Sequence, residues 1–156
     1  MKFNKRLSQA LAVKINPVAK QCYHNSWMAM IHLELAAEQQ ELLYCEGWAI
    51  SGALDFPIQH GWLQVDSNVV DISPGWRDDC EHKQDVSTIY HPVWQLEPAE
   101  FSERLSFSAS LPLCPINPPY EFYKVYLEIV EKKGVHLPEL RAQIDNLKRS
   151  ERPCKD

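Results

Sequence analysis

Apolar residues near the start of the chain recur at helical spacing. In residues 5–14, Leu7 and Leu11 fall on one side of a helix, which predicts a short amphipathic helix. A second, longer helix is predicted after Asn16-Pro17, a capping residue and a first-turn proline, and runs to about Gln39. Its apolar positions go round the whole cylinder, which indicates a central, buried helix; they are Cys22, Trp27, Met28, Met30, Ile31, Leu33 and Leu35.

The start of this longer helix has two alternatives, and they differ in where they place Cys22. If the helix begins at Pro17, Cys22 lies in the second turn, where the field of the helix N-terminus has mostly faded. If the chain turns again before Gln21, Cys22 lies in the first turn.

The pattern then changes to that of strands. Residues 42–51 are predicted to form a strand with mixed burial on both faces. Residues 58–72 alternate as a hairpin when the turn lies at residues 66–68. One face then carries Leu63, Val65, Val70 and Ile72, and the opposite face carries His60, Trp62, Gln64 and Asp71.

The hairpin turn decides how near His60 and Asp71 lie. A four-residue loop over residues 65–68 places Asp71 opposite Trp62 and diagonal to His60, at a backbone separation of about 7–8 Å that side chains can bridge. A two-residue turn at residues 67–68 separates the two side chains further and needs a bulge in the strand.

The second half of the chain mixes loops, one strand and helices. The predicted elements are a polar loop at 74–85, an edge or bulged strand at 86–96, a short helix from Glu97-Pro98 to about Leu105, an irregular stretch at 110–119, a helix at 120–133 that ends at Gly134, and a last helix from Pro138. The whole pattern predicts the α+β class, in which an N-terminal helical part packs on a small antiparallel β-sheet and C-terminal helices close one side. We expect a single domain over residues 1–150 and a flexible tail over residues 151–156.

Charge and composition narrow the classes of partner. The 156 residues contain 16 Lys and Arg against 21 Asp and Glu, a net charge of −5, so nucleic acid is not an expected partner. No apolar run approaches the length of a membrane span, and the segment after the basic start is too short and polar for a signal sequence. The five cysteines, an odd number with no recurring interval, indicate reduced thiols and a cytoplasmic protein.

Three residues occur in the order that a thiol catalytic site requires. A thiol is mostly protonated at neutral pH, so it needs a base within hydrogen-bond reach, and the base needs a third group that fixes its tautomer. Cys22 near the start of a helix, His60 early in the hairpin and Asp71 on the return strand fit the roles of nucleophile, base and orienting acid. The alternative for Cys22 is a structural cysteine of the core.

A resemblance supports this assignment. The segments His60-Gly61-Trp62, Val70-Asp71 and Ser73-Pro74-Gly75-Trp76 resemble the histidine-x-tryptophan strand and the valine-aspartate-proline turn of transglutaminase-like proteins, within the wider papain-like cysteine-protease fold. Small proteins, some of them phage-encoded, are similar over Cys22, Glu46-Gly47 and His60-x-Trp62. The resemblance implies a papain-like core with Cys22 in the first turn of its helix.

Other residues are candidates for contacts with a substrate. Trp62 and Trp76 are expected to wall a cleft beside the thiol, although aromatic packing in the core explains them equally well. Glu46, an acid inside an apolar strand, is functional, exposed or part of a structural ion pair. The candidates for stabilising a developing oxyanion are Asn16, Gln21 and the backbone amide of Cys22.

The expected chemistry is acyl transfer on an amide bond of a protein or peptide through a Cys22 thioester. Water as acceptor makes the chain a peptidase, amidase or deamidase, and an amine makes it a transglutaminase. The alternative is a papain-like scaffold without turnover that serves as a protein-binding or inhibitory module. No metal or cofactor is expected, because the possible zinc ligands Cys80, His82, His91 and Cys114 lack the paired Cys-x-x-Cys of a zinc knuckle.

Overall fold

The computed structural model describes most of the chain. It covers residues 1–36, 41–50, 57–73, 88–108, 110–113 and 120–132, together with residues 134, 138, 141, 142, 145 and 146. The chain divides into two compact units, Met1–Leu113 and Cys114–Asp156. The tail at 151–156 and the whole of the predicted polar loop at 74–85 lie outside the described residues.

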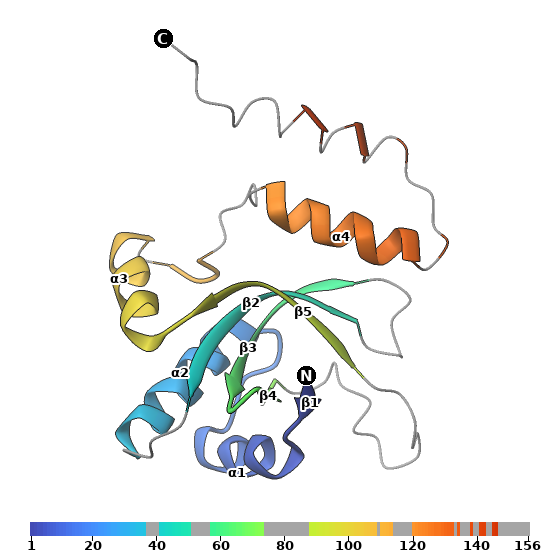
Figure 1. The fold of residues 1–156 in the computed structure, drawn as a ribbon. Coiled ribbons are helices and arrows are strands. Elements are labelled where there is room, and N and C mark those ends of the chain that lie inside the picture. The colour runs from blue at the N-terminus through green and yellow to red at the C-terminus, as the bar shows by residue number, and fades with distance from the viewer. Residues whose placement is uncertain are drawn as a thin grey trace. The chain divides into compact units, whose positions relative to one another are not determined.

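The first unit contains a five-stranded sheet. Its strands are β1 (Lys2–Phe3), β2 (Leu42–Ile50), β3 (Ile58–Val65), β4 (Asn68–Val70) and β5 (Ile89–Leu96). They lie in the order β1-β4-β3-β2-β5 (Figure 1). All neighbours pair antiparallel except β1 and β4, which are parallel, so the sheet is mixed and the prediction of an antiparallel sheet was wrong on this point. A strand of two residues is too short to show alternation, which explains why the sequence pattern did not reveal β1.

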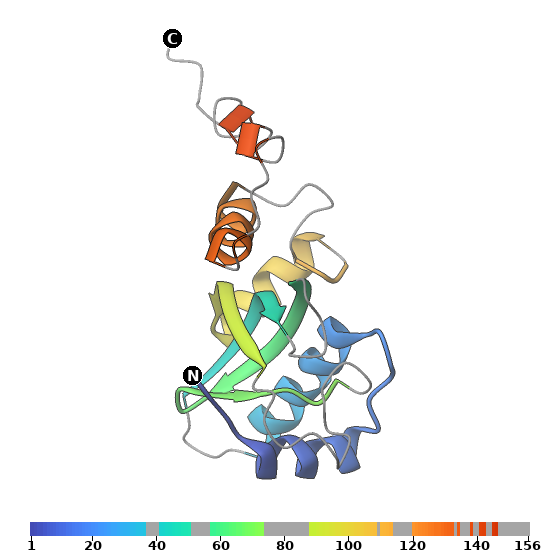
Figure 2. The same cartoon turned by 90° about the vertical axis from the view of Figure 1, so that its right-hand side faces the viewer.

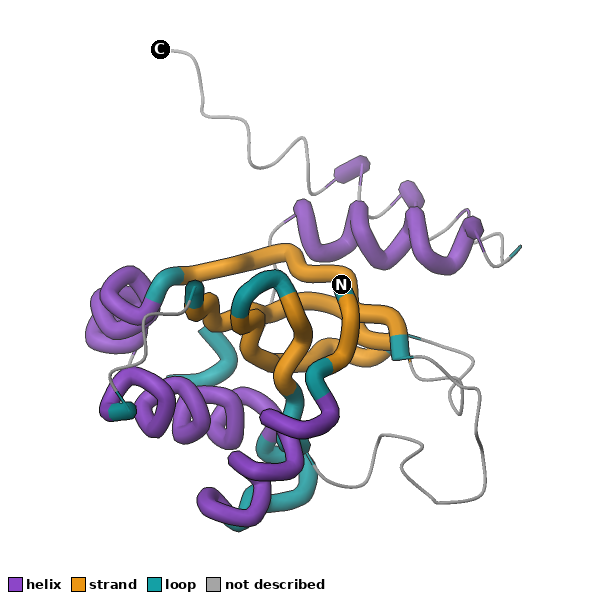
Figure 3. The backbone as a smooth tube through the Cα atoms, turned by 60° about the horizontal axis from the view of Figure 1, so that its bottom comes forward, coloured by secondary structure: helices purple, strands orange, loops and turns teal. Residues whose placement is uncertain are grey.

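Three helices cover one face of this sheet. They are α1 (Lys5–Ile15), α2 (Cys22–Leu35) and α3 (Pro98–Ser108). Helix α2 packs on β3 and β2, α1 on α2 and β4, and α3 on β2 and β5. Figures 2 and 3 show α1 and α2 together on one side of the strands. The core that they share with the sheet contains Leu11, Met30, Leu33, Tyr44, Leu63, Val70, Leu96 and Phe101, and the arrangement agrees with the predicted α+β class.

Helix α2 begins at Cys22, which is the second of the two predicted alternatives. Upstream, Asn16 is left-handed with a φ of 52° and ends α1 instead of starting a helix, and Lys20 is left-handed with a φ of 65°. The buried side chain of Asn25 holds the backbone between them, because it accepts a hydrogen bond from Val18 N–H at 3.0 Å and donates one to Val18 C=O at 2.7 Å. Cys22 therefore lies in the first turn of the helix.

The hairpin of β3 and β4 closes through a tight turn at residues 66–67. Their φ values of 47° and 63° are both left-handed, as in two-residue turns that match the twist of a hairpin. Residue 65 pairs with residue 68, and continuing this register places Asp71 opposite Trp62 and on the same face as His60. This is the nearer of the two predicted registers.

Strand β5 lies at the edge of the sheet and contains Pro92, as predicted. Its register with β2 shifts between Glu46 and Gly47, as expected for a bulge. Gly47 approaches β5 so closely that a Cβ atom there would overlap the carbonyl oxygen of His91. Only glycine fits at this position.

The second unit contains helix α4 (Tyr120–Lys132). Its apolar cluster consists of Leu127 and Val130, with Tyr120, Tyr123 and Tyr126 packed against them. Gly134 follows with a φ of 78°, the left-handed conformation common at the end of a helix. No helix in the described part of the chain is long and apolar enough to cross a lipid bilayer.

Candidate active site

The side chains of His60, on β3, and Asp71, the residue after β4, are in contact. Atom Nε2 of His60 lies 2.9 Å from Oδ2 of Asp71. Both residues are almost fully buried, with exposed fractions of 2% and 1%. The hairpin register explains the contact, because it sets the two residues diagonally across neighbouring strands and on one face.

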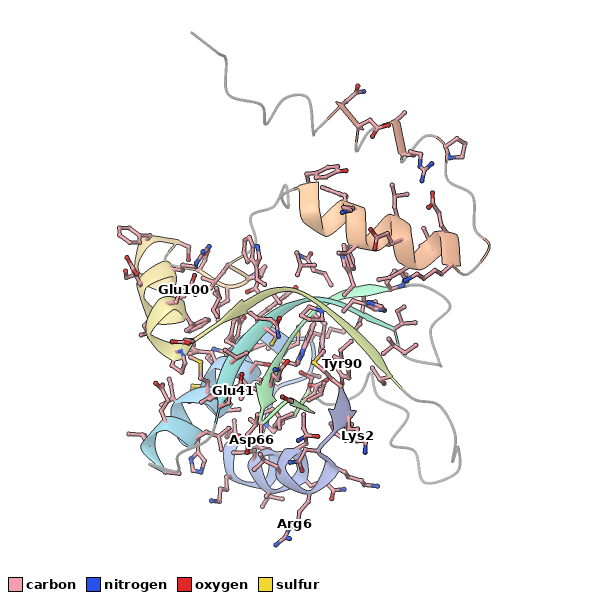
Figure 4. The ribbon with its side chains drawn as sticks, in the orientation of Figure 1. Lys2, Arg6, Glu41, Asp66, Tyr90 and Glu100 are labelled. Carbon is pink, nitrogen blue, oxygen red and sulfur yellow. The ribbon has the colours of Figure 1, made fainter. Side chains whose placement is uncertain are left out.

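Asp71 is held by three further hydrogen bonds. Tyr90 Oη donates to the same Oδ2 at 2.8 Å, and Ser73 N–H donates to Oδ1 at 2.9 Å. The Asp71 N–H in turn donates to Ser8 Oγ of α1 at 3.2 Å. Tyr90 lies on β5 (labelled in Figure 4), so β3 and β5 both bind this carboxylate through His60 and Tyr90, and α1 binds the backbone of Asp71. A tyrosine in a strand and a serine in a helix carry no sequence signal of such a role.

The contact changes the pKa of both side chains. Burial lowers the pKa of His60, but the charge and hydrogen bond of Asp71, with smaller contributions from Cys22, outweigh it and raise the pKa to about 9. Burial raises the pKa of Asp71, but the charge and hydrogen bond of His60, together with Ser73 and Tyr90, outweigh it and lower the pKa. At neutral pH the pair is therefore an imidazolium bound to a carboxylate.

This pair predicts how stability depends on pH. The free energy of unfolding should fall as pH rises from about 6.5 to about 9, because folded His60 keeps a proton that the unfolded chain releases. It should also fall at acid pH, below the usual range of an aspartate, because unfolded Asp71 takes up a proton first. Urea unfolding at a series of pH values measures both effects. His60→Gln should lack the alkaline fall, and the same fall in that variant would contradict the assignment.

The third predicted residue, Cys22, lies within hydrogen-bond reach of His60. It is half-buried at the start of α2, and its hydrogen bond is one of the interactions that raise the pKa of His60. Because Asp71 occupies Nε2, Nδ1 is the ring nitrogen that remains for the sulfur. The structure thus brings Cys22, His60 and Asp71 together in the order that the sequence predicted.

Gly61 explains how α2 comes so close to β3 beside His60. A Cβ atom on Gly61 would lie 2.7 Å from the ring of Tyr23 and 3.2 Å from its Cα atom. The buried Ser26 hydroxyl also donates to the Gly61 carbonyl at 2.9 Å. The glycine of the His60-Gly61-Trp62 segment is therefore needed for contact between the helix and the strand.

Glu46 is fully buried and binds groups of the protein itself. Its Oε1 accepts from Tyr44 Oη at 2.9 Å and from Leu113 N–H at 2.7 Å. Burial, the charge of Glu46 and its hydrogen bond raise the pKa of Tyr44 well above its usual value, and Cys22 adds a smaller electrostatic contribution. Glu46 therefore ties β2 to the segment after α3, close to the thiol.

An open groove of about 700 Å³ adjoins the start of α2. Gln21, which precedes Cys22, and Tyr23, which follows it, both line this groove. Its other walls include Trp27 of α2, Leu105 of α3 and Leu111. Of the predicted substrate residues, Gln21 therefore lies where a ligand of this groove would contact it.

The remaining predicted residues lie elsewhere. Trp62 is fully buried beside the site, with its ring 6.3 Å from that of His60 and 5.1 Å from that of Tyr90, so it packs the imidazole instead of lining an open cleft. Asn16 is exposed and caps the end of α1. Outside the described residues are Trp76, Cys80, His82 and Cys114. Within the described ranges, no group of three or more His, Cys, Asp and Glu residues could hold a metal ion.

Comparison of the chain with protein-family models, with curated proteins and with solved structures found no match.

Proposed function

We propose that this protein is a thiol-dependent acyl-transfer enzyme that acts on amide bonds, with a transglutaminase-like variant of the papain-like core. The observation that carries the proposal is the position of His60, which Asp71 binds on one ring nitrogen while Cys22 forms a hydrogen bond with the same imidazole. A nucleophile, a base and a group that orients the base form the constellation of covalent acyl transfer.

In the proposed mechanism, His60 holds the proton that the Cys22 thiol gives up. The sulfur of Cys22, once it has given up this proton, attacks the amide carbonyl carbon and forms a C–S bond. His60 then donates its proton to the leaving amine as the C–N bond breaks, and a thioester remains. Water or a second amine attacks the thioester carbon, and His60 takes the proton of the attacking group. The C–S bond then breaks, so that the acid or the new amide is released and the sulfur of Cys22 takes the proton back from His60.

The tetrahedral intermediate carries a negative charge on its oxygen. Cys22 is the first residue of α2, so its backbone N–H points out of the helix N-terminus without a partner inside the helix. This amide is the proposed oxyanion donor, with the exposed side chain of Gln21 as a second donor at the mouth of the groove.

Iodoacetamide labelling at pH ~6, read peptide by peptide in a mass spectrometer, tests the proposal. Cys22 should react about tenfold faster than Cys45 and the other cysteines, and His60→Ala should remove this advantage. His32→Ala, which removes an imidazole near the other end of α2, is the matched control and should leave the rate unchanged.

Equal reactivity of all cysteines, or a His60→Ala variant that folds and labels like the parent, would refute the thiol site. A reactive Cys22 without turnover of any amide would instead favour the protein-binding module, which keeps the scaffold without the reaction.

A further inference from the structure

We propose that the groove beside Cys22 binds the acyl side of the substrate, a peptide with a large apolar side chain next to the reacting carbonyl and an acidic residue before it. This inference rests on the proposed function, since it names the substrate class of the same thiol. It depends on the position, the apolar wall and the charge of the groove.

The position of the groove links it to the chemistry. The residues on both sides of Cys22 in the chain, Gln21 and Tyr23, line it. We therefore assign the groove to the side chain next to a carbonyl carbon that contacts the sulfur. The volume of about 700 Å³ is sufficient for two side chains of a peptide.

Large apolar side chains make up much of the lining of the groove. Trp27 and Tyr23 of α2, Leu105 of α3 and Leu111 all line it, and all four side chains are half-buried. Such a lining removes water from an aromatic or aliphatic side chain but offers few partners to a polar one. The lining therefore selects a large apolar residue next to the carbonyl.

The rim of the groove carries positive charge. This charge is that of Lys20, which lines the groove and is exposed, and none of the described residues that line the groove is acidic. The chain as a whole has a net charge of −5, so a basic rim at this place differs from the average surface. A carboxylate of the substrate is complementary to this rim, whereas a basic residue is not.

The wall opposite α2 is held in place. Leu111 lies two residues before Leu113, whose N–H donates to the buried carboxylate of Glu46 at 2.7 Å. Because β2 carries Glu46, this bond fixes the segment after α3 to the sheet. The groove is therefore formed before a ligand binds, which lowers the entropy lost on binding.

Three thiol-directed probes test the inference: the N-acetyl chloromethyl ketones of Asp-Phe, Asn-Phe and Asp-Gly. The sulfur attacks the methylene carbon of each, a C–S bond forms and chloride leaves. On the parent protein, Asp-Phe should label Cys22 about tenfold faster than Asp-Gly, because phenylalanine fills the apolar part of the groove. The Asp-Phe probe should also label Cys22 about two- to fivefold faster than the Asn-Phe probe, because an exposed ion pair changes a rate by about this factor.

The variant Lys20→Asn completes the design, since asparagine tolerates the left-handed backbone at this position. It should abolish the difference between Asp-Phe and Asn-Phe and keep the preference for phenylalanine. Lys14→Asn removes an exposed charge from α1 outside the groove and should change neither ratio.

The outcomes separate the two proposals. Equal rates for the three probes, together with rapid and His60-dependent labelling of Cys22 by iodoacetamide, would overturn the groove assignment and leave the proposed function standing. A Cys22 that also fails the iodoacetamide test would overturn both.

Discussion

Replacing Asp71 with asparagine is expected to lower the alkylation rate of Cys22 at pH ~6 by about tenfold or more, and any turnover by up to about 10⁴-fold, while the fold persists. The carboxylate accepts at Oδ2 from both His60 and Tyr90 and holds the imidazole protonated. An amide of the same size lacks the charge and can present its N–H₂ group to the ring, which favours the wrong tautomer. The alkylation rate and the melting temperature are measured on the same samples.

Two variants serve as controls for this prediction. Tyr90→Phe leaves the carboxylate charged and removes one hydrogen bond, so its effect on the rate should be in the same direction and smaller. Asp66→Asn makes the same substitution in the exposed turn of the same hairpin and should leave the rate unchanged. If Asp71→Asn lost about 0.5–2 kcal/mol of stability but kept the parent rate, Asp71 would only cap the following turn through Ser73, and a Cys22-His60 pair would remain.

Replacing Glu46 with alanine is expected to cost about 2–5 kcal/mol of unfolding free energy, because Tyr44 Oη and Leu113 N–H lose their buried acceptor together. For a chain of this length the loss corresponds to a decrease of about 5–15 °C in melting temperature. Calorimetry or thermal denaturation followed by circular dichroism measures it.

The matched variant is Glu46→Gln, which keeps an oxygen acceptor in the same place and should cost less than half as much. Because Glu46 holds the groove wall, Glu46→Ala should also weaken the preference between peptide probes while Cys22 still reacts with iodoacetamide. An alanine variant as stable as the parent would contradict the view that this carboxylate ties β2 to the segment after α3.

The part of the site that could be predicted from the sequence is the part that depends on strand alternation. Alternation placed His60 and Asp71 on one face, and the structure shows their side chains in contact. The order of the elements from Lys5 to Lys132 also follows from periodicity, because long apolar patterns are set mainly by which face is buried.

The parts that could not be predicted depend on contacts between distant residues. Asn16-Pro17 has the composition of a helix start, but the side chain of Asn25 binds Val18 and moves the start of α2 to Cys22. The sequence could not show whether Glu46 is exposed, paired or functional. Its partner Leu113 contributes only a backbone N–H, which every residue except proline has. The groove residues of α2 and the segment after α3 come together only through tertiary packing, which no local pattern encodes.

Cys45 gives the sheet its own reporter of transient opening. It is fully buried, and burial raises the pKa of its thiol to about 12, although hydrogen bonds from Gln64 and Gln95 act in the opposite direction. A thiol in this state reacts only when β2 separates from its neighbours, so its labelling rate divided by that of an unprotected cysteine gives the equilibrium constant for opening. One labelling time course thus gives two quantities. The rate at Cys22 reports the chemistry of the candidate site, and the rate at Cys45 reports the free energy of opening of β2.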